Sequence, residues 1–336
     1  NVNHDTDNYM NLPIIHEFKL PYYEQLSIKI PSLLHSIKKI YDYQPDEIVL
    51  STPGPIGIVG LIASKLMNIK SKGIYHTDFT AQVSEIKSDP SLIKLVDSFT
   101  HYFYQLCDEV HVTTKSYMNI LESRGIDRHK MKLFERGVDP ETFYPRKYGK
   151  IYLKQNFNLN EGIYFLYTGR ISKDKNLDII TKAFSELSKE YQNIFLLLVG
   201  DGPYKKELEK SIKNNRIIFT GKIDRNLLPE IYSGSDVFLF PSTTDTYGMS
   251  VLEAQACELP CLVSDKGGPQ DLIVPNKTGY VLEGLNIQCW KNKMKEFISA
   301  INKKDKFIYE MKRSAVMNAQ KKGDWNRFLK NFLQYE

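Results

Sequence analysis

The sequence predicts an α/β protein with two doubly wound domains, each built on a parallel sheet. At 336 residues, the chain exceeds the roughly 250–300 residues at which single hydrophobic cores stop growing. Apolar strand patterns alternate with helical patterns in both halves, and this alternation is typical of parallel sheets. We expect an N-terminal domain over residues 1–146, a C-terminal domain over 147–318 and a terminal helix over 319–336.

Four strand patterns lie in the N-terminal half, at residues 14–21, 46–54, 72–79 and 109–113. Helices are predicted at 31–43, at 56–67 and on both sides of the last strand within 91–126. In the first helix, one face collects the apolar residues Leu33, Leu34, Ile37, Ile40 and Tyr41. Two prolines, Pro140 and Pro145, indicate the boundary that follows.

The C-terminal half repeats the alternation with five strands, at 162–170, 194–203, 216–221, 236–242 and 260–265. Helices are predicted at 176–189, 204–213 and 226–234, within 240–260, at the start of 267–273 and along 314–336. In the last of these, Trp325 and Phe328 have a spacing suited to packing on another part of the protein.

Composition excludes several classes of protein. With 42% apolar and 25% charged residues and no apolar run near the ~20 residues that span a bilayer, the chain reads as globular and cytoplasmic. A net charge of +5 is too small for a nucleic-acid protein, but it suits an enzyme that handles anionic ligands or rests on an anionic membrane surface. The four cysteines form no CxxC pair and indicate a reducing compartment.

Ligands of such sheets bind at the carboxyl ends of the strands. Arg170 directly follows the strand-ending Gly169, and Lys175 comes five residues later. A forked guanidinium and a mobile ammonium there suit a diphosphate, although, taken alone, such residues are more often a solvated basic turn. Glycines after the next two strands, Gly200 and Gly221, would let a nucleotide approach the backbone. The segment GDGPYK lacks the third glycine of a dinucleotide fingerprint, so NAD is not expected.

The segment FPSTTDTYGMSVLEAQACELP (240–260) contains two carboxylates eight residues apart. Asp245 could cap the helix that follows it. Glu253 lies inside an apolar helix, where an unpaired charge would cost several kcal/mol, so it needs a partner; ribose hydroxyls would serve.

His76 and Asp78 follow a strand, where an imidazole could bond a substrate hydroxyl and a carboxylate could orient a group. A structural role is the alternative for both. No second histidine stands three or four residues from His76, so zinc is not indicated. The segment DTDN (5–8) imitates a metal motif but follows no apolar strand, so no metal site is predicted.

Taken in order, these motifs resemble those of retaining GT-B glycosyltransferases of family four. The C-terminal matches are GxRx4K, VGDGP, FTG, PSTTDTYG…LEAQA and KGGPQDLIVPNKTGYVLE. The N-terminal matches, PDEIVLSTPGPIG, YHTDF and RGVDPETFYP, resemble the branch that contains lipid-directed sugar transferases. The resemblance implies two Rossmann-like domains facing a cleft, with a terminal helix that crosses back to the first domain.

The resemblance also implies a reaction, the transfer of a hexose from a UDP- or GDP-sugar to a hydroxyl group of a lipid or a membrane-associated glycan. No cofactor or metal is expected, and each motif has an implied role. Arg170 and Lys175 would bind the diphosphate, Glu253 the ribose, and Asp245 and His76 the sugar. The remaining implied substrate contacts are Asp78, Gly169, Gly221, Lys222, Ile223, Tyr247, Gly248, Met249 and Ser250.

Two departures from the family pattern matter. The first acidic position of the E-x7-E signature is Asp245 where most of the family has Glu, which leaves the sugar open. The chain also begins at what resembles the third strand, so we expect that the first βαβ part, with its Gly-rich loop, lies upstream. That gap motivates an alternative function, a non-catalytic protein that binds sugar nucleotides. An isomerase or epimerase on a similar scaffold lacks identifiable catalytic acids here.

Overall fold

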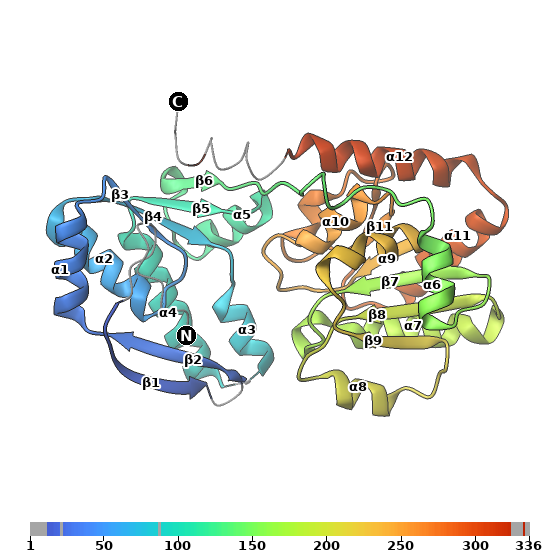
Figure 1. The fold of residues 1–336 in the computed structure, drawn as a ribbon, viewed down its shortest axis with the longest axis horizontal. Helices are drawn as coiled ribbons and strands as arrows, with labels where there is room; N and C mark the ends of the chain where they lie inside the picture. Colours follow the sequence, from blue (N-terminus) through green and yellow to red (C-terminus); the bar gives the residue numbers. More distant parts are fainter. Residues whose placement is uncertain (1–11, 21–22, 87–88, 324–331, 333–336) are drawn as a thin grey trace. The chain divides into compact units, whose positions relative to one another are not determined.

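The computed structural model describes residues 12–20, 23–86, 89–323 and 332, and the chain divides into two compact units (Figure 1). Unit 1 comprises Asn1–Val83, Asp89–Val112 and Met118–Leu133, and unit 2 comprises Ser84–Ser88, Thr113–Tyr117 and Phe134–Glu336. The division after Leu133 differs from the predicted boundary at residue 146. The reason is that Val138 and Phe143 are buried in the hydrophobic core of unit 2.

Unit 1 contains a four-stranded parallel sheet in the order β3-β4-β5-β6. Its strands are β3 (Glu47–Leu50), β4 (Lys70–Tyr75), β5 (Glu109–Val112) and β6 (Met131–Leu133). Its helices are α1 (Leu33–Tyr43), α2 (Pro55–Met67), α3 (Phe79–Ile86), α4 (Pro90–Leu106) and α5 (Lys115–Ser123). The predicted strands and helices of this half are confirmed as elements; β2 (Tyr23–Pro31), α3 and β6 were not predicted.

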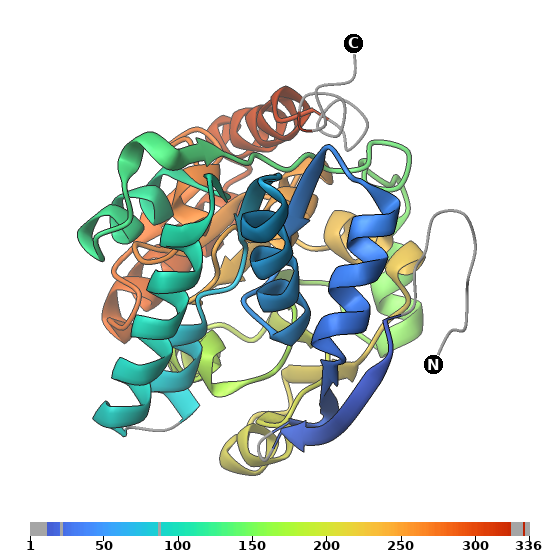
Figure 2. The ribbon, with the colours of Figure 1, turned by 90° about the vertical axis from the view of Figure 1, so that its left-hand side faces the viewer.

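The first predicted strand does not join this sheet. Instead, β1 (Ile14–Leu20) pairs with β2 (Tyr23–Pro31) in a separate antiparallel hairpin. Helices α1 and α2 pack against each other (Figure 2). The apolar face predicted for α1 is left largely exposed, since Leu34 is 79% and Tyr41 61% exposed, and Ser36 is the buried residue of the helix.

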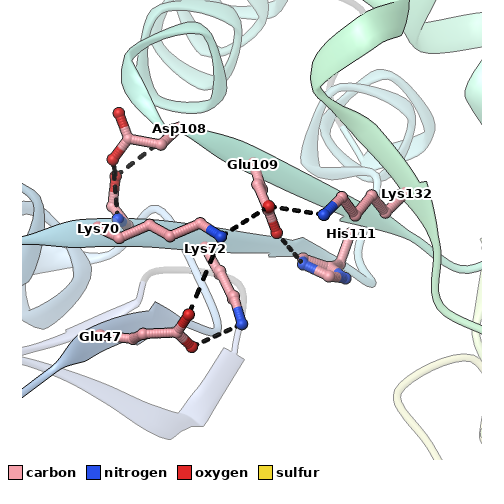
Figure 3. A network of polar contacts seen from close by, with 8 residues as sticks. Glu47, Lys70, Lys72, Asp108, Glu109, His111 and Lys132 are labelled. Carbon is pink, nitrogen blue, oxygen red and sulfur yellow. Dashed lines mark hydrogen bonds and ion pairs between the residues drawn. The ribbon is translucent and has the colours of Figure 1, made fainter. Parts of the chain in front are cut away.

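Charged residues line one face of the unit 1 sheet (Figure 3). The strand register pairs Glu47 with Lys70, Lys72 with Glu109, and His111 with Lys132. Glu109 accepts bonds from Lys132 at 2.6 Å and Lys70 at 2.9 Å, and Lys72 lies 2.5 Å from Glu47. Burial opposes the ionisation of Glu109, but its two lysine partners outweigh burial and lower its pKa to about 2. Ion pairs therefore connect neighbouring strands on this face of the sheet.

Unit 2 contains a six-stranded parallel sheet in the order β12-β11-β10-β7-β8-β9 (Figure 1). The strands are β7 (Ile163–Thr168), β8 (Ile194–Val199), β9 (Ile217–Gly221), β10 (Val237–Phe240), β11 (Cys261–Ser264) and β12 (Gly279–Leu282). The helices are α6 (Gly149–Phe157), α7 (Leu177–Glu190), α8 (Lys205–Ser211), α9 (Leu228–Gly234), α10 (Met249–Ala256), α11 (Ile287–Asn302) and α12 (Lys306–Lys321), with a short 3₁₀ turn at η3 (Arg225–Leu227). The five predicted strands are confirmed; α6, β12 and α11 were not predicted.

The strand order decides where a ligand can bind in unit 2. From β7 the chain adds β8 and β9 on one side and then returns to place β10 on the other side. The carboxyl ends of β7 and β10 therefore flank the point where the order reverses, which is the usual ligand site of such sheets. All residues of β7 and β10 are buried, so both strand ends are firmly placed.

Two predictions concern residues outside the described part of the chain. The predicted terminal helix (319–336) lies outside the described residues beyond Gly323, apart from Phe332, whose ring contacts that of Phe134 edge-on with the centroids 5.1 Å apart. Trp325 and the DTDN segment are likewise outside the described residues.

Candidate functional site

Glycines end three neighbouring strands of unit 2. Gly169, Gly200 and Gly221 follow or end β7, β8 and β9, and their φ angles are 152°, 139° and 74°. A Cβ on Gly200 would lie 1.9 Å from the carbonyl oxygen of Gly169, so no larger residue fits there. At Gly221 the nearest atom to a Cβ would be the Lys205 amine, 3.8 Å away. The ends of β8 and β9 thus present backbone that has no side chain of its own at Gly200 and Gly221.

Lys175 stands between two carboxylates. Its Nζ lies 2.7 Å from Oδ2 of Asp245 and 3.0 Å from Oδ2 of Asp174. Burial lowers the pKa of Lys175, but the two carboxylates, Asp245 first, raise it above its ordinary value. Lys175 is therefore protonated, and its amine is fixed between two carboxylates instead of being surrounded by water.

Asp174 connects this lysine to Arg170. Its Oδ1 lies 3.8 Å from a guanidinium nitrogen of Arg170, and its Oδ2 accepts from Thr244 at 3.3 Å. Asp174 is buried, which alone would raise its pKa, yet the Lys175 charge holds the pKa below its usual value. Sequence analysis missed Asp174, although an acid directly before a predicted functional lysine is a signal for such a pair.

The loop that carries Asp245 is fixed from several sides. Asn176 donates to the hydroxyl of Thr243 at 3.0 Å, and the backbone N–H of Gly268 donates to the carbonyl of Asp245 at 2.8 Å. Gly248, with φ of 92°, precedes α10 as its N-cap residue and makes no side-chain cap bond. Asp245 is therefore not the helix cap that its sequence allowed; it is the partner of Lys175.

Glu253 has its partners within the protein. Its side chain is 5% exposed, Oε1 accepts from Arg225 at 2.8 Å, and Oε2 accepts from the Tyr232 hydroxyl at 3.1 Å. Burial raises the pKa of Glu253, and the Arg225 charge opposes that rise. The expected need for a partner is thus met by Arg225 and Tyr232, which sequence analysis missed. The signal was available, since Arg225 comes four residues after the strand-ending Gly221.

The other predicted residues of this half differ in exposure and in their contacts. Met249 and Ser250 begin α10 and are half-buried, Lys222 is exposed, and Ile223 packs partly against the core. Tyr247 is buried, and its hydroxyl donates to the carbonyl of Arg136. The Tyr247 side chain is therefore already bonded within the protein.

Two family models match the chain, one on each half. Residues 2–142 match the model described as Glycosyltransferase Family 4, and residues 151–314 match the model described as Glycosyl transferases group 1. Together they cover nearly the whole chain, in the order that a two-domain glycosyltransferase has. Both halves of the chain match glycosyltransferase families.

Curated relatives of the chain carry glycosyltransferase names. Sulfoquinovosyl transferase SQD2 of Arabidopsis thaliana is 26% identical over 92% of the chain, and a GDP-mannose-dependent alpha-mannosyltransferase of Mycobacterium tuberculosis is 26% identical over 78%. An alpha-monoglucosyldiacylglycerol synthase of Streptococcus pneumoniae is 28% identical over 72%. The chain spans 57–66% of the length of these relatives.

Solved structures establish the fold of the chain. Anabaena HepE in complex with UDP superposes with a TM-score of 0.76 at 18% identity, over 90% of the chain and 80% of HepE. The two Rossmann-like units therefore form a GT-B protein, as the sequence predicted.

The candidate residues of unit 1 are Asp78 and His76. Asp78 is buried, accepts two bonds from Arg124 at 3.1 and 3.0 Å, and accepts the backbone N–H of Ala81 at the start of α3. These contacts give Asp78 a structural role. His76 follows the end of β4 and is half-buried.

Two absences hold for the described part of the chain. No three His, Cys, Asp or Glu side chains gather there as a metal site. Nor is any helix of the described ranges long and apolar enough to span a bilayer.

Proposed function

We propose that this protein is a retaining hexosyltransferase that moves a hexose from a UDP- or GDP-linked donor to a hydroxyl acceptor. The observation that carries the proposal is the 2.7 Å contact between Lys175 and Asp245 at the carboxyl ends of β7 and β10. A cation and a carboxylate meet there beside glycines that leave the backbone open, as a charged and hydroxylated ligand requires.

Arg170 and Lys175 would bind the donor diphosphate. The Arg170 side chain is 38% exposed and can turn toward a ligand, whereas Lys175 is held in place by two acids. Bond cleavage leaves negative charge on the departing nucleotide, and fixed cations stabilise that charge more effectively than solvent does. Positive charge from these two side chains would make a metal ion unnecessary.

Asp245 would bind hydroxyls of the donor sugar, since a carboxylate accepts about four hydrogen bonds and Lys175 uses one of them. The backbone N–H groups of Gly248, Met249 and Ser250, at the start of α10, would lie beside the sugar and phosphate. Gly221, Lys222 and Ile223 would contact the base through their backbone. His76 is predicted to contact the sugar, and that role stays a prediction.

The acceptor would be a lipid or a membrane-associated glycan. Support comes from the names of relatives, one of which acts as an alpha-monoglucosyldiacylglycerol synthase. Donor support is similar, because another relative is described as GDP-mannose-dependent. The Asp at position 245 leaves the choice of hexose open.

The test is product analysis by mass spectrometry after incubating the full-length protein with UDP- and GDP-hexoses and a lipid extract. We expect one donor to yield a glycosylated lipid, whose anomeric configuration, read by NMR, matches that of the donor. Inversion would overturn the retaining mechanism alone. Donor binding without hydrolysis or transfer across the panel would favour the non-catalytic alternative, and absence of binding would overturn both.

A further inference from the structure

A chain of hydrogen bonds links four elements of unit 2 at Glu253. The hydroxyls of Thr168, at the end of β7, and of Tyr232, on α9, lie 2.6 Å apart. Tyr232 donates to Glu253 on α10, and Arg225 in η3 donates to the other carboxylate oxygen. These hydrogen bonds therefore connect β7, which precedes Arg170, with the η3 turn, which follows Gly221.

Tyr232 and Arg225 differ in how much freedom they have. Tyr232 is fully buried, which raises its pKa and keeps its hydroxyl protonated as a donor. Arg225 is 61% exposed, but its guanidinium lies over the ring of buried Phe143 at 4.9 Å. Asp224 caps the η3 turn by accepting the N–H of Asn226 at 2.9 Å. Arg225 is thus an exposed cation whose position is set by an aromatic ring and a capped turn.

Among the described contacts of Glu253, the positive charge comes from Arg225. Tyr232 and Thr168 are neutral, so without Arg225 the buried carboxyl would have only a neutral hydroxyl bond to favour ionisation. With Arg225 present, each oxygen of Glu253 accepts one bond, and a carboxylate can accept about four. The free acceptor sites suit two adjacent hydroxyl groups.

We propose that Arg225 is a positioning residue for ribose recognition. It holds Glu253 ionised and oriented so that the remaining acceptor sites of the carboxylate bind the hydroxyls of the nucleotide ribose. The inference rests on the proposed function, in which Glu253 is the ribose ligand. Arg225 itself need not touch the donor.

The test measures binding of UDP and GDP, of their 2′,3′-dideoxy analogues and of pyrophosphate by calorimetry between pH 6 and 9. The full-length protein is compared with Arg225→Ala and Arg225→Lys, and with Arg128→Ala as a matched control. Arg128 is an arginine of unit 1 that is 39% exposed and pairs with Glu122 at 3.6 Å. Thermal unfolding verifies that each variant folds.

We expect Arg225→Ala to lose about tenfold or more of the preference for ribose over dideoxyribose at neutral pH, because a charge-assisted bond is lost. Part of that preference should return as pH rises, because the Glu253 carboxyl ionises at a higher pH in this variant. Arg225→Lys should retain most of the preference, and pyrophosphate binding should not change in any variant.

Two outcomes would overturn the inference while leaving the proposed function intact. One is an unchanged ribose preference and pH profile in Arg225→Ala, which would make the residue structural. The other is tighter nucleotide binding at every pH, which would make Arg225 a competitor of the ribose. If the unaltered protein binds no nucleoside diphosphate at all, the proposed function itself fails.

Discussion

Lys175 and Asp245 are 70 residues apart in the chain, yet their side chains meet at 2.7 Å. They do so because β7 and β10 are neighbours in the sheet, and each residue sits in the loop that follows its strand. Asp174 adds a third charge, 3.0 Å from the same amine. The Lys175 side chain is only 10% exposed, so water stabilises its charge little. The charges of Lys175, Asp174 and Asp245 therefore stabilise one another.

Lys175→Ala should remove nucleotide binding and also destabilise unit 2. The substitution leaves Asp174 buried without its nearest cation, and breaking such a pair costs about 3 kcal/mol. Calorimetry with UDP and GDP, together with urea unfolding, measures the two effects. Lys175→Arg is the matched control, because it keeps the charge. Full nucleotide affinity in a folded Lys175→Ala protein would exclude the diphosphate role.

Two glycine substitutions should differ in severity. Gly200→Ala places a Cβ 1.9 Å from a backbone oxygen at φ of 139°, and we expect it to cost about 3 kcal/mol or more. Gly221→Ala makes only an ordinary contact, 3.8 Å from the Lys205 amine, at φ of 74°, so strain alone should cost about 1–2 kcal/mol. Denaturant midpoints of the two variants test this order. Equal losses would show that the clash at Gly200 is relieved by backbone movement.

Unit 1 should lose stability in acid through Glu109. Its folded pKa of about 2 lies below the ordinary value of 4.5, so its ion pairs stabilise the fold above pH 4.5, and that stability is lost as pH falls toward 2. We expect on the order of 2 kcal/mol from this group. Glu109→Gln should be less stable than the unaltered protein at pH 7 and should show a flatter decline between pH 5 and 2, measured by urea unfolding. A decline identical to that of the unaltered protein would assign the acid sensitivity to other carboxylates.

His76 and Asp78, two residues apart, should respond differently to replacement. Asp78→Asn removes the charge that pairs with Arg124 and caps α3, so we expect a lower melting temperature. His76→Ala should leave the melting temperature and donor binding unchanged and should lower transfer, as the family resemblance implies. Unaltered transfer in His76→Ala would remove His76 from the catalytic residues.

Transfer should not depend on a divalent metal ion. Because Arg170 and Lys175 would neutralise the diphosphate, EDTA should leave the rate of the proposed transfer within about twofold of that of the untreated protein. Addition of Mg²⁺ or Mn²⁺ after EDTA is the control. A rate that collapses with EDTA and recovers with either metal would contradict this expectation.

The alternation of strands and helices was predictable because continuous apolar runs such as 194–199 and 163–168 can hardly be anything but buried parallel strands. The GxRx4K turn and the segment 240–260 were also recognisable, because their motifs are local. In contrast, the exposure of the apolar face of α1 in the described part of unit 1 was not predictable. Periodicity indicates which residues share a face, but it does not indicate what packs against that face. Similarly, Val138 and Phe143 belong to the core of unit 2, so the division between the units falls before the two prolines that suggested the boundary.

The sequence by itself determined the succession of elements, the family and the segments that carry the candidate site. Only the tertiary structure decided the partners of the charged groups: Asp245 is paired with Lys175 and is no helix cap, Glu253 is satisfied by Arg225 and Tyr232, and Asp78 is bonded to Arg124. The physical reason is that a helix or strand is indicated by the hydrophobic pattern of a few consecutive residues. An ion pair, in contrast, forms between residues far apart in the sequence when the strand order brings opposite charges together.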